Sequence, residues 1–137
     1  MRRVFVDTGP IVALLRKREA QHAWAADQFD QLEVAYTCEP VLAEACARIQ
    51  KLGGDPLDVL AFVEAGVLVV EFDLAPNVAA VRALMHKYRD QPMDLADACL
   101  VLMSEQWPDC SVLTLDTDFH TFRRRGREPI PLLIPPR

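Results

Sequence analysis

Residues 4–15 have the sequence VFVDTGPIVALL, in which a single acidic residue follows an apolar run and precedes a helix start. The β-branched run Val4–Val6 predicts a short buried strand, because such side chains suit a sheet that is covered on both faces. The segment Thr8-Gly9-Pro10 predicts that a helix begins at once, since proline suits the first helical turn. Asp7 is therefore expected at the carboxyl end of a strand.

Strand and helix patterns alternate along the rest of the chain. Apolar runs predict further strands at Val34–Cys38, Val67–Phe72, Ser111–Leu115 and Leu132–Ile134. Helical spacing and capping residues predict helices at Ala20–Leu32, from Pro40 to about Leu52, from Asp55 to about Glu64, from Ala75 through Tyr88, at Asp94–Gln106 and at Asp118–Arg124. This alternation predicts an α/β fold of three layers, α-β-α, around a five-stranded, mostly parallel sheet. The prolines around the last strand place it at an edge.

Length and composition narrow the class of protein. The 137 residues fit one domain, residues 1–137, and 51% of them are apolar, which is enough for a substantial core. The longest apolar stretches are far shorter than the roughly 20 residues that a membrane helix needs. Asp7 and Pro10 interrupt the N-terminal apolar run, as they would not in a secretory signal. We expect a cytoplasmic protein without a membrane segment.

The cysteines agree with a reducing compartment. They show no CxxC spacing, and three of them lie in apolar surroundings, so we expect buried free thiols. They are Cys38, Cys46, Cys99 and Cys110.

Four acidic residues have corresponding places in this predicted fold. Asp7 and Asp116 each lie just past the end of a predicted strand, and Glu44 and Asp97 lie in the first turns of predicted helices. In parallel sheets the ligand crevice lies outside the carboxyl ends of the strands, so the connectivity can bring all four together. Two unit charges 4 Å apart repel by roughly 4 kcal/mol at an effective dielectric near 20. A hard divalent cation, which prefers carboxylate oxygens, would neutralise that repulsion, and we therefore expect a metal site.

Asp7 and Glu44 also have explanations that need no metal. An aspartate commonly starts a turn like the one that follows Asp7. Glu44 would be favoured near the positive end of its helix and could pair with Arg48 four residues later. The apolar neighbours of Glu44, in contrast, favour a carboxylate that points inward. Only the joint placement of the acids favours the metal.

The other two acids each have an acidic neighbour. Asp94 suits the N-cap of its helix, and Asp97 would then be the third-position acid of a capping box. Asp118 is placed to cap the short helix that follows Asp116. We favour Asp97 and Asp116 as ligands, with Asp94 and Asp118 as caps, outer-sphere acids or alternative ligands.

The charge of the chain says less about its substrate than the acidic residues do. A net charge of −5 excludes a strongly basic surface of the kind that binds nucleic acid through bulk electrostatics. Two local basic clusters could still hold the phosphates that flank a reacting one, although solvated surface explains them equally well. The candidate RNA-binding residues in these clusters are Arg16, Lys17, Arg123 and Arg124.

Taken together, four motifs of this chain resemble those of the PIN-domain ribonucleases, in particular the VapC-type toxins of bacterial toxin–antitoxin pairs. The first motif has an acid and a small hydroxyl residue after the first predicted strand. The last motif has a strand followed by an acid and an Asp-Phe pair. The motifs are VDTGPIVAL at 6–14, PVLAEA at 40–45, DLADA at 94–98 and LTLDTDF at 113–119. Their order and separations make the resemblance specific, and it spans nearly the whole chain.

The resemblance implies a function and a set of site residues. Asp7, Glu44, Asp97 and Asp116 would be the catalytic acids and would bind one or two Mg²⁺ or Mn²⁺ ions. The hydroxyls of Thr8 and Thr114 would line the pocket. The family further implies cleavage of RNA, a homodimer, and inhibition by a small antitoxin that inserts a side chain near the metal.

Two other classes of protein are compatible with parts of this pattern. A PIN-like domain without catalysis could serve as a binding or scaffold module, and it would not bind Mn²⁺. An α/β phosphotransfer domain also places acids at strand ends. A haloacid-type enzyme, however, would have Asp-x-Asp after its first strand, where this chain has Gly9, and a receiver would have a lysine after its last strand.

Overall fold

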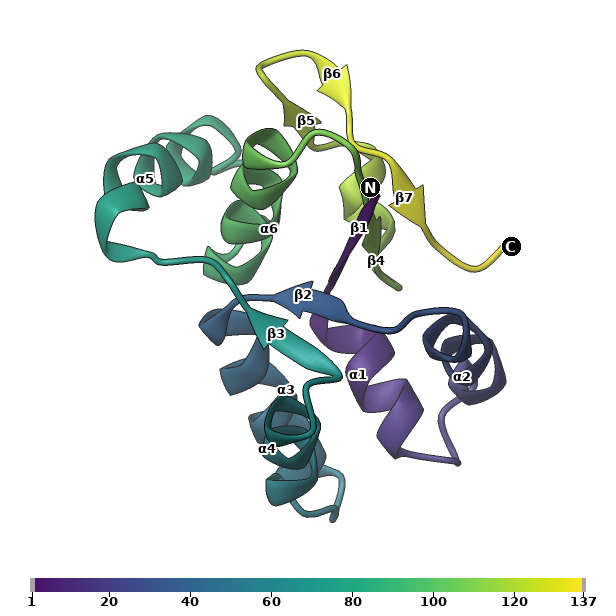
Figure 1. The fold of residues 1–137 in the computed structure, drawn as a ribbon. Coiled ribbons are helices and arrows are strands. Elements are labelled where there is room, and N and C mark those ends of the chain that lie inside the picture. Colours follow the sequence, from purple (N-terminus) through teal and green to yellow (C-terminus); the bar gives the residue numbers. More distant parts are fainter. Residues whose placement is uncertain (1, 137) are drawn as a thin grey trace.

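The computed structural model describes residues 2–136, and a parallel sheet of five strands runs through it (Figure 1). The order across the sheet is β3-β2-β1-β4-β7, and each neighbouring pair is parallel. The strands are β1 (Arg3–Val6), β2 (Ala35–Thr37), β3 (Leu68–Val70), β4 (Cys110–Leu113) and β7 (Leu132–Leu133). The predicted five-stranded parallel sheet is thus confirmed, and its proline-flanked last strand does lie at an edge.

Helices flank this sheet. They are α1 (Thr8–Leu15), α2 (His22–Asp30), α3 (Glu39–Lys51), α4 (Leu57–Glu64), α5 (Val78–Lys87) and α6 (Leu95–Gln106), with short 3₁₀ helices η1 (Ala75–Asn77) and η2 (Thr117–His120). Figure 1 shows α5 and α6 together on one side of the strands, with α1, α3 and α4 grouped on the other. This is the predicted α/β architecture. Since α1 follows β1 after one residue and η2 follows β4 after three, the chain presents several helix starts at the carboxyl edge of the sheet.

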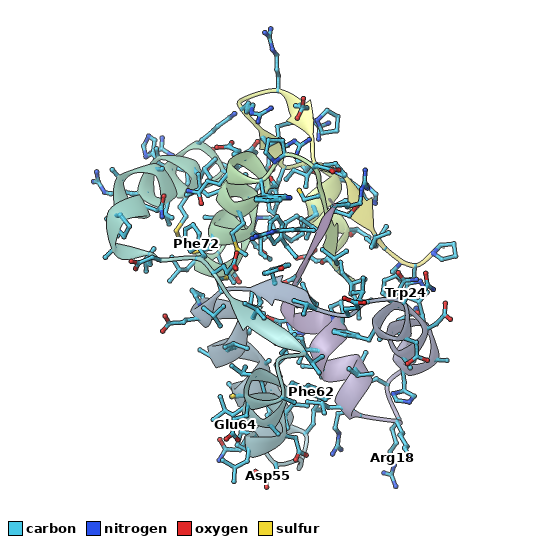
Figure 2. The ribbon with its side chains drawn as sticks, in the orientation of Figure 1. Arg18, Trp24, Asp55, Phe62, Glu64 and Phe72 are labelled. Atoms are coloured by element: carbon cyan, nitrogen blue, oxygen red, sulfur yellow. The ribbon has the colours of Figure 1, made fainter. Side chains whose placement is uncertain are left out.

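The core lies where α6 packs against the central strands. Every residue from Ala96 to Ser104 is buried, as are all four residues of β4, so this helix and strand are enclosed by protein. Trp24 on α2 and Phe62 on α4 are partly buried against the same core, whereas Arg18 and Asp55 are exposed at the outer surface (Figure 2).

One predicted helix was wrong in its length. The helix expected over Asp118–Arg124 ends as η2 at His120, and Arg123–Arg124 forms β5 of a two-stranded antiparallel ribbon with β6 (Glu128–Pro129). Arg125 and Gly126 both adopt positive φ, 51° and 83°, which reverses the chain where a helix would have to continue.

The cysteines bear out a further expectation. All four thiols are free, and three of them, Cys38, Cys99 and Cys110, are buried. No helix within residues 2–136 combines the length and the apolarity needed to cross a bilayer.

Candidate active site

A cavity of about 340 Å³ opens where β1 and β4 end and where α3 and α6 begin. Among residues 2–136, six carboxylates and one guanidinium line it. The carboxylates belong to Asp7, Glu44, Asp94, Asp97, Asp116 and Asp118, and the guanidinium belongs to Arg48. The four acids that the sequence singled out therefore share one cavity with both of their acidic neighbours.

Asp7 is buried and is the N-cap of α1. Its Oδ1 accepts a hydrogen bond from the Thr8 backbone N–H at 2.8 Å, and its Oδ2 accepts one from Thr114 Oγ1 at 2.8 Å. The side chain is enclosed, and burial raises the pKa of Asp7 to about 6. The two hydrogen bonds oppose this rise, while the charges of Glu44 and Asp116 add to it. Asp7 is thus a carboxylate that protein donors orient but do not neutralise.

Asp97 combines a capping role with a place in the cavity. Asp94 Oδ1 accepts from the Asp97 backbone N–H at 2.8 Å, and Asp97 Oδ2 accepts from the Asp94 backbone N–H at 3.1 Å, which completes a capping box. Asp97 is buried and Asp94 is exposed. The pKa of Asp97 is raised to about 8, mainly by burial and also by the nearby charges of Asp94, Asp7 and Asp116, while the hydrogen bond from the Asp94 N–H opposes the rise. The predicted cap is present, and it fixes a carboxylate that remains costly to ionise.

Glu44 is held by two donors from different elements. Its Oε2 accepts a hydrogen bond from Thr8 Oγ1 at 3.2 Å, and its Oε1 lies 2.8 Å from Arg48 Nη2. The expected pairing of Glu44 with Arg48 is confirmed. Because Thr8 also bonds Asp7 through its backbone, this threonine links two of the four acids.

Asp116 reaches the cavity from the turn after β4. Its backbone N–H donates to Thr114 Oγ1 at 2.9 Å, and its Oδ1 accepts from the Asp118 backbone N–H at 2.9 Å. Asp116 rather than Asp118 therefore caps the short helix, so that prediction was wrong. The reason is that β4 ends at Leu113, two residues earlier than expected, and η2 already begins at Thr117. The pKa of Asp118 is raised, first by burial and then by the charge of the neighbouring Asp116.

The hydroxyl of Thr114 serves both Asp7 and Asp116, which makes its removal informative. Thr114→Val leaves Asp7 Oδ2 without a donor and the Asp116 N–H without an acceptor in a buried place, so we expect the free energy of unfolding to fall by about 1–3 kcal/mol. The pKa of Asp7 should rise further, since the lost hydrogen bond lowers it. Urea denaturation measures the first effect. Thr114→Ser keeps the hydroxyl and is the matched control; equal losses in both variants would contradict this account.

The donor set fits a hard divalent cation. Among residues 2–136, no group of three or more histidine, cysteine or acidic side chains is arranged as a metal-coordinating cluster. Each of the four acids accepts a hydrogen bond from a nearby donor instead. The acids around the cavity offer only oxygen ligands, which suit Mg²⁺ or Mn²⁺ rather than soft metals. Burial, together with the neighbouring acids, raises the pKa of Asp7 and Asp97, so their ionised forms are disfavoured unless a cation binds.

The basic residues expected to contact RNA lie elsewhere. Arg16 donates to the Leu52 carbonyl, and Arg123 donates to the carbonyls of His120 and Phe122. Lys17 is exposed just after α1.

Arg124 requires a correction, because it is buried. Its guanidinium donates to the carbonyls of Ser104 and Pro108 and pairs with Glu128, so it holds the β5–β6 ribbon onto α6 and is not free to bind RNA. Sequence reasoning missed the one arginine that lines the cavity, Arg48. Its spacing from Glu44 was the available indication, and it was interpreted only as a stabilising pair.

Comparisons with known proteins give a family and a fold. The family model described as PIN domain matches residues 4–125. The crystal structure of VapC20 from Mycobacterium tuberculosis, described as a sarcin-ricin loop cleaving toxin, is 20% identical and superposes with a TM-score of 0.78 over 86% of this chain and 93% of that one. The crystal structure of FitAcB from Neisseria gonorrhoeae is 22% identical, with a TM-score of 0.52 over 83% of this chain and 88% of that one. No curated protein matches in sequence. Because the family model matches most of its length, the chain belongs to the PIN domain family.

Proposed function

We propose that this protein is a metal-dependent endoribonuclease that hydrolyses RNA phosphodiester bonds. The observation that carries the proposal is the cavity in which Asp7, Glu44, Asp97 and Asp116 meet, where Arg48 is the one cation among the described lining residues. Such a cavity disfavours a polyanion unless a cation binds first, and a phosphodiester is the substrate class that a carboxylate-held cation serves. Membership of the PIN domain family and the fold shared with a sarcin-ricin loop cleaving toxin support this substrate class.

The same four acids would hold one or two Mg²⁺ or Mn²⁺ ions. When bound, such an ion supplies a water of lowered pKa and stabilises negative charge on the phosphate. The protein's own contribution is orientation. Thr8 and Thr114 fix the Asp7 carboxylate, and the capping box fixes Asp97.

Two further acids lie beside these ligands. Asp94 holds Asp97 through the capping box, and Asp118 holds Asp116 through its backbone N–H. We assign both to the outer sphere of the cation, with direct ligation as the alternative.

A place in a toxin–antitoxin pair is the biological role that we propose. The protein would be the toxin, a homodimer in the cytoplasm, and a small antitoxin would inhibit it. The shared fold with VapC20, described as a toxin, supports this role. Free thiols in the core are consistent with a reducing compartment.

Cleavage of a labelled RNA by the purified chain tests the proposed function. We expect cleavage with Mn²⁺ or Mg²⁺, none with excess EDTA, and recovery when the metal is restored. Asp58→Asn, a change at an exposed acid on α4, is the control and should cleave like the wild type. A wild type that binds Mn²⁺ but cleaves no RNA would contradict the nuclease, and one that binds no Mn²⁺ would favour the scaffold module.

A further inference from the structure

Arg48 is the one cation around the acidic cavity in the described part of the chain. It lies on α3, one helical turn after Glu44, with its Nη2 2.8 Å from Glu44 Oε1. The arginine side chain is 52% exposed and that of Glu44 is 32% exposed. An exposed pair of this kind stabilises a helix by only about 0.3–0.5 kcal/mol. Structural stabilisation is therefore a small part of what an arginine at this position can do.

A second cavity, of about 210 Å³, adjoins the first beside Arg48. The two cavities share Gly9, Arg48 and Leu115 as lining residues, so they form neighbouring parts of one depression with Arg48 at the junction. The second cavity has a largely apolar wall, to which Val12 and Ala13 contribute, and among its described lining residues Glu19 is the one carboxylate, against six in the first cavity. A polyanionic strand that leaves the acids therefore meets a cation and then a wall with less negative charge.

We propose that Arg48 binds a backbone phosphate of the RNA at this junction, next to the reacting phosphate, and that it exchanges its bond to Glu44 for that phosphate. The inference rests on the proposed function. Carboxylate and phosphate present the same geometry to the planar guanidinium, so one can replace the other. The exchange also releases Glu44 Oε1, an oxygen that the cation would use. Arg48 thus pairs with Glu44 in the free protein and with the RNA phosphate in the complex.

Arg48→Gln tests the inference through two readouts that a structural role would not move together. We expect KM for a single-stranded RNA to rise about 10- to 100-fold, with kcat changed less. The slope of log KM against log salt should fall by about 0.7, the value for one single-strand phosphate contact. Mn²⁺ affinity should stay equal or become tighter, because the guanidinium no longer competes for Glu44. Arg48→Lys should keep the salt slope and recover part of KM.

Lys51→Gln is the matched control, since Lys51 is an exposed cation in the last turn of the same helix. It should leave KM, the salt slope and Mn²⁺ affinity at wild-type values. Wild-type KM and salt slope in Arg48→Gln would overturn the inference while leaving the nuclease in place. Loss of Mn²⁺ affinity in parallel with cleavage would also overturn it, since Arg48 would then only support Glu44. A wild type that cleaves no RNA would instead refute the proposed function, and this inference with it.

Discussion

Replacing Asp97 by asparagine is expected to lower the rate of Mn²⁺-dependent RNA cleavage by about 10²–10³-fold, the usual cost of removing one group that stabilises charge in the transition state. The change removes a negative charge from the cavity and leaves its shape nearly unaltered. Because an asparagine oxygen can still accept from the Asp94 N–H, the capping box can persist. The comparison of initial rates at saturating Mn²⁺ measures the effect.

Stability separates this loss from misfolding. Burial and neighbouring acids raise the pKa of Asp97 to about 8, so its ionised form is costly to the fold. We expect the metal-free Asp97→Asn protein to be at least as stable as the wild type at pH 8, by urea denaturation. Full activity in the variant would contradict the assignment of Asp97, and a loss of stability would contradict the electrostatic account.

The stability of the metal-free protein should fall as pH rises from about 4 to about 8. The folded-state pKa of Asp7 is about 6 against a usual 3.8, and that of Asp97 is about 8. Well below pH 3.8 both groups are protonated in the folded and unfolded chains and have no effect. At higher pH the unfolded chain ionises, whereas the folded chain keeps each proton until the pH reaches its raised pKa. The cost to stability accumulates over that range and is complete above the folded pKa. For Asp7 alone that cost is on the order of 3 kcal/mol, at 1.36 kcal/mol per pKa unit.

A bound cation should reverse this loss, because it favours the ionised acids. Thermal unfolding at pH 5.5 and pH 8, with EDTA and with Mn²⁺, measures the effect. We expect a lower Tm at pH 8 in EDTA and a much smaller difference in Mn²⁺. Asp97→Asn should flatten most of the pH dependence in EDTA, because the loss from Asp97 continues up to about pH 8 whereas that from Asp7 is largely complete near pH 6; this variant also controls for the histidines. Equal Tm values at the two pH values in EDTA would contradict the raised pKa values.

Sequence patterns were sufficient for the sheet and for the approach of the acids. Asp7 follows a strand so apolar that it had to be buried, and parallel connectivity then brought it near Asp116 and the starts of α3 and α6. These inferences use only local pattern and the geometry of parallel sheets. For that reason the acids were placed together even though the ends of several strands differed by one or two residues.

Features decided by tertiary contacts were not predictable in the same way. Whether Asp116 or Asp118 caps η2 depends on where β4 ends, which is set by its pairing with β1 and β7. Arg124 seemed a surface cation, but the carbonyls of Ser104 and Pro108 give it buried acceptors from elsewhere in the chain.

Arg48 was recognised as a partner of Glu44, but its place between two cavities requires α1 and the turn after β4 to be positioned first. Neither position follows from the sequence of α3 alone. The cluster of acids was accessible from the sequence, whereas the surroundings of each charge required the fold.

Calorimetric titration of the metal-free protein with Mn²⁺ tests most directly whether the clustered acids form a cation site. We predict saturable binding of one or two ions per chain at pH 8, together with proton release from the acids of raised pKa. Binding should weaken at least about tenfold in Asp7→Asn and remain unchanged in Asp58→Asn. Absence of binding in the wild type, or equal binding in Asp7→Asn, would contradict the account.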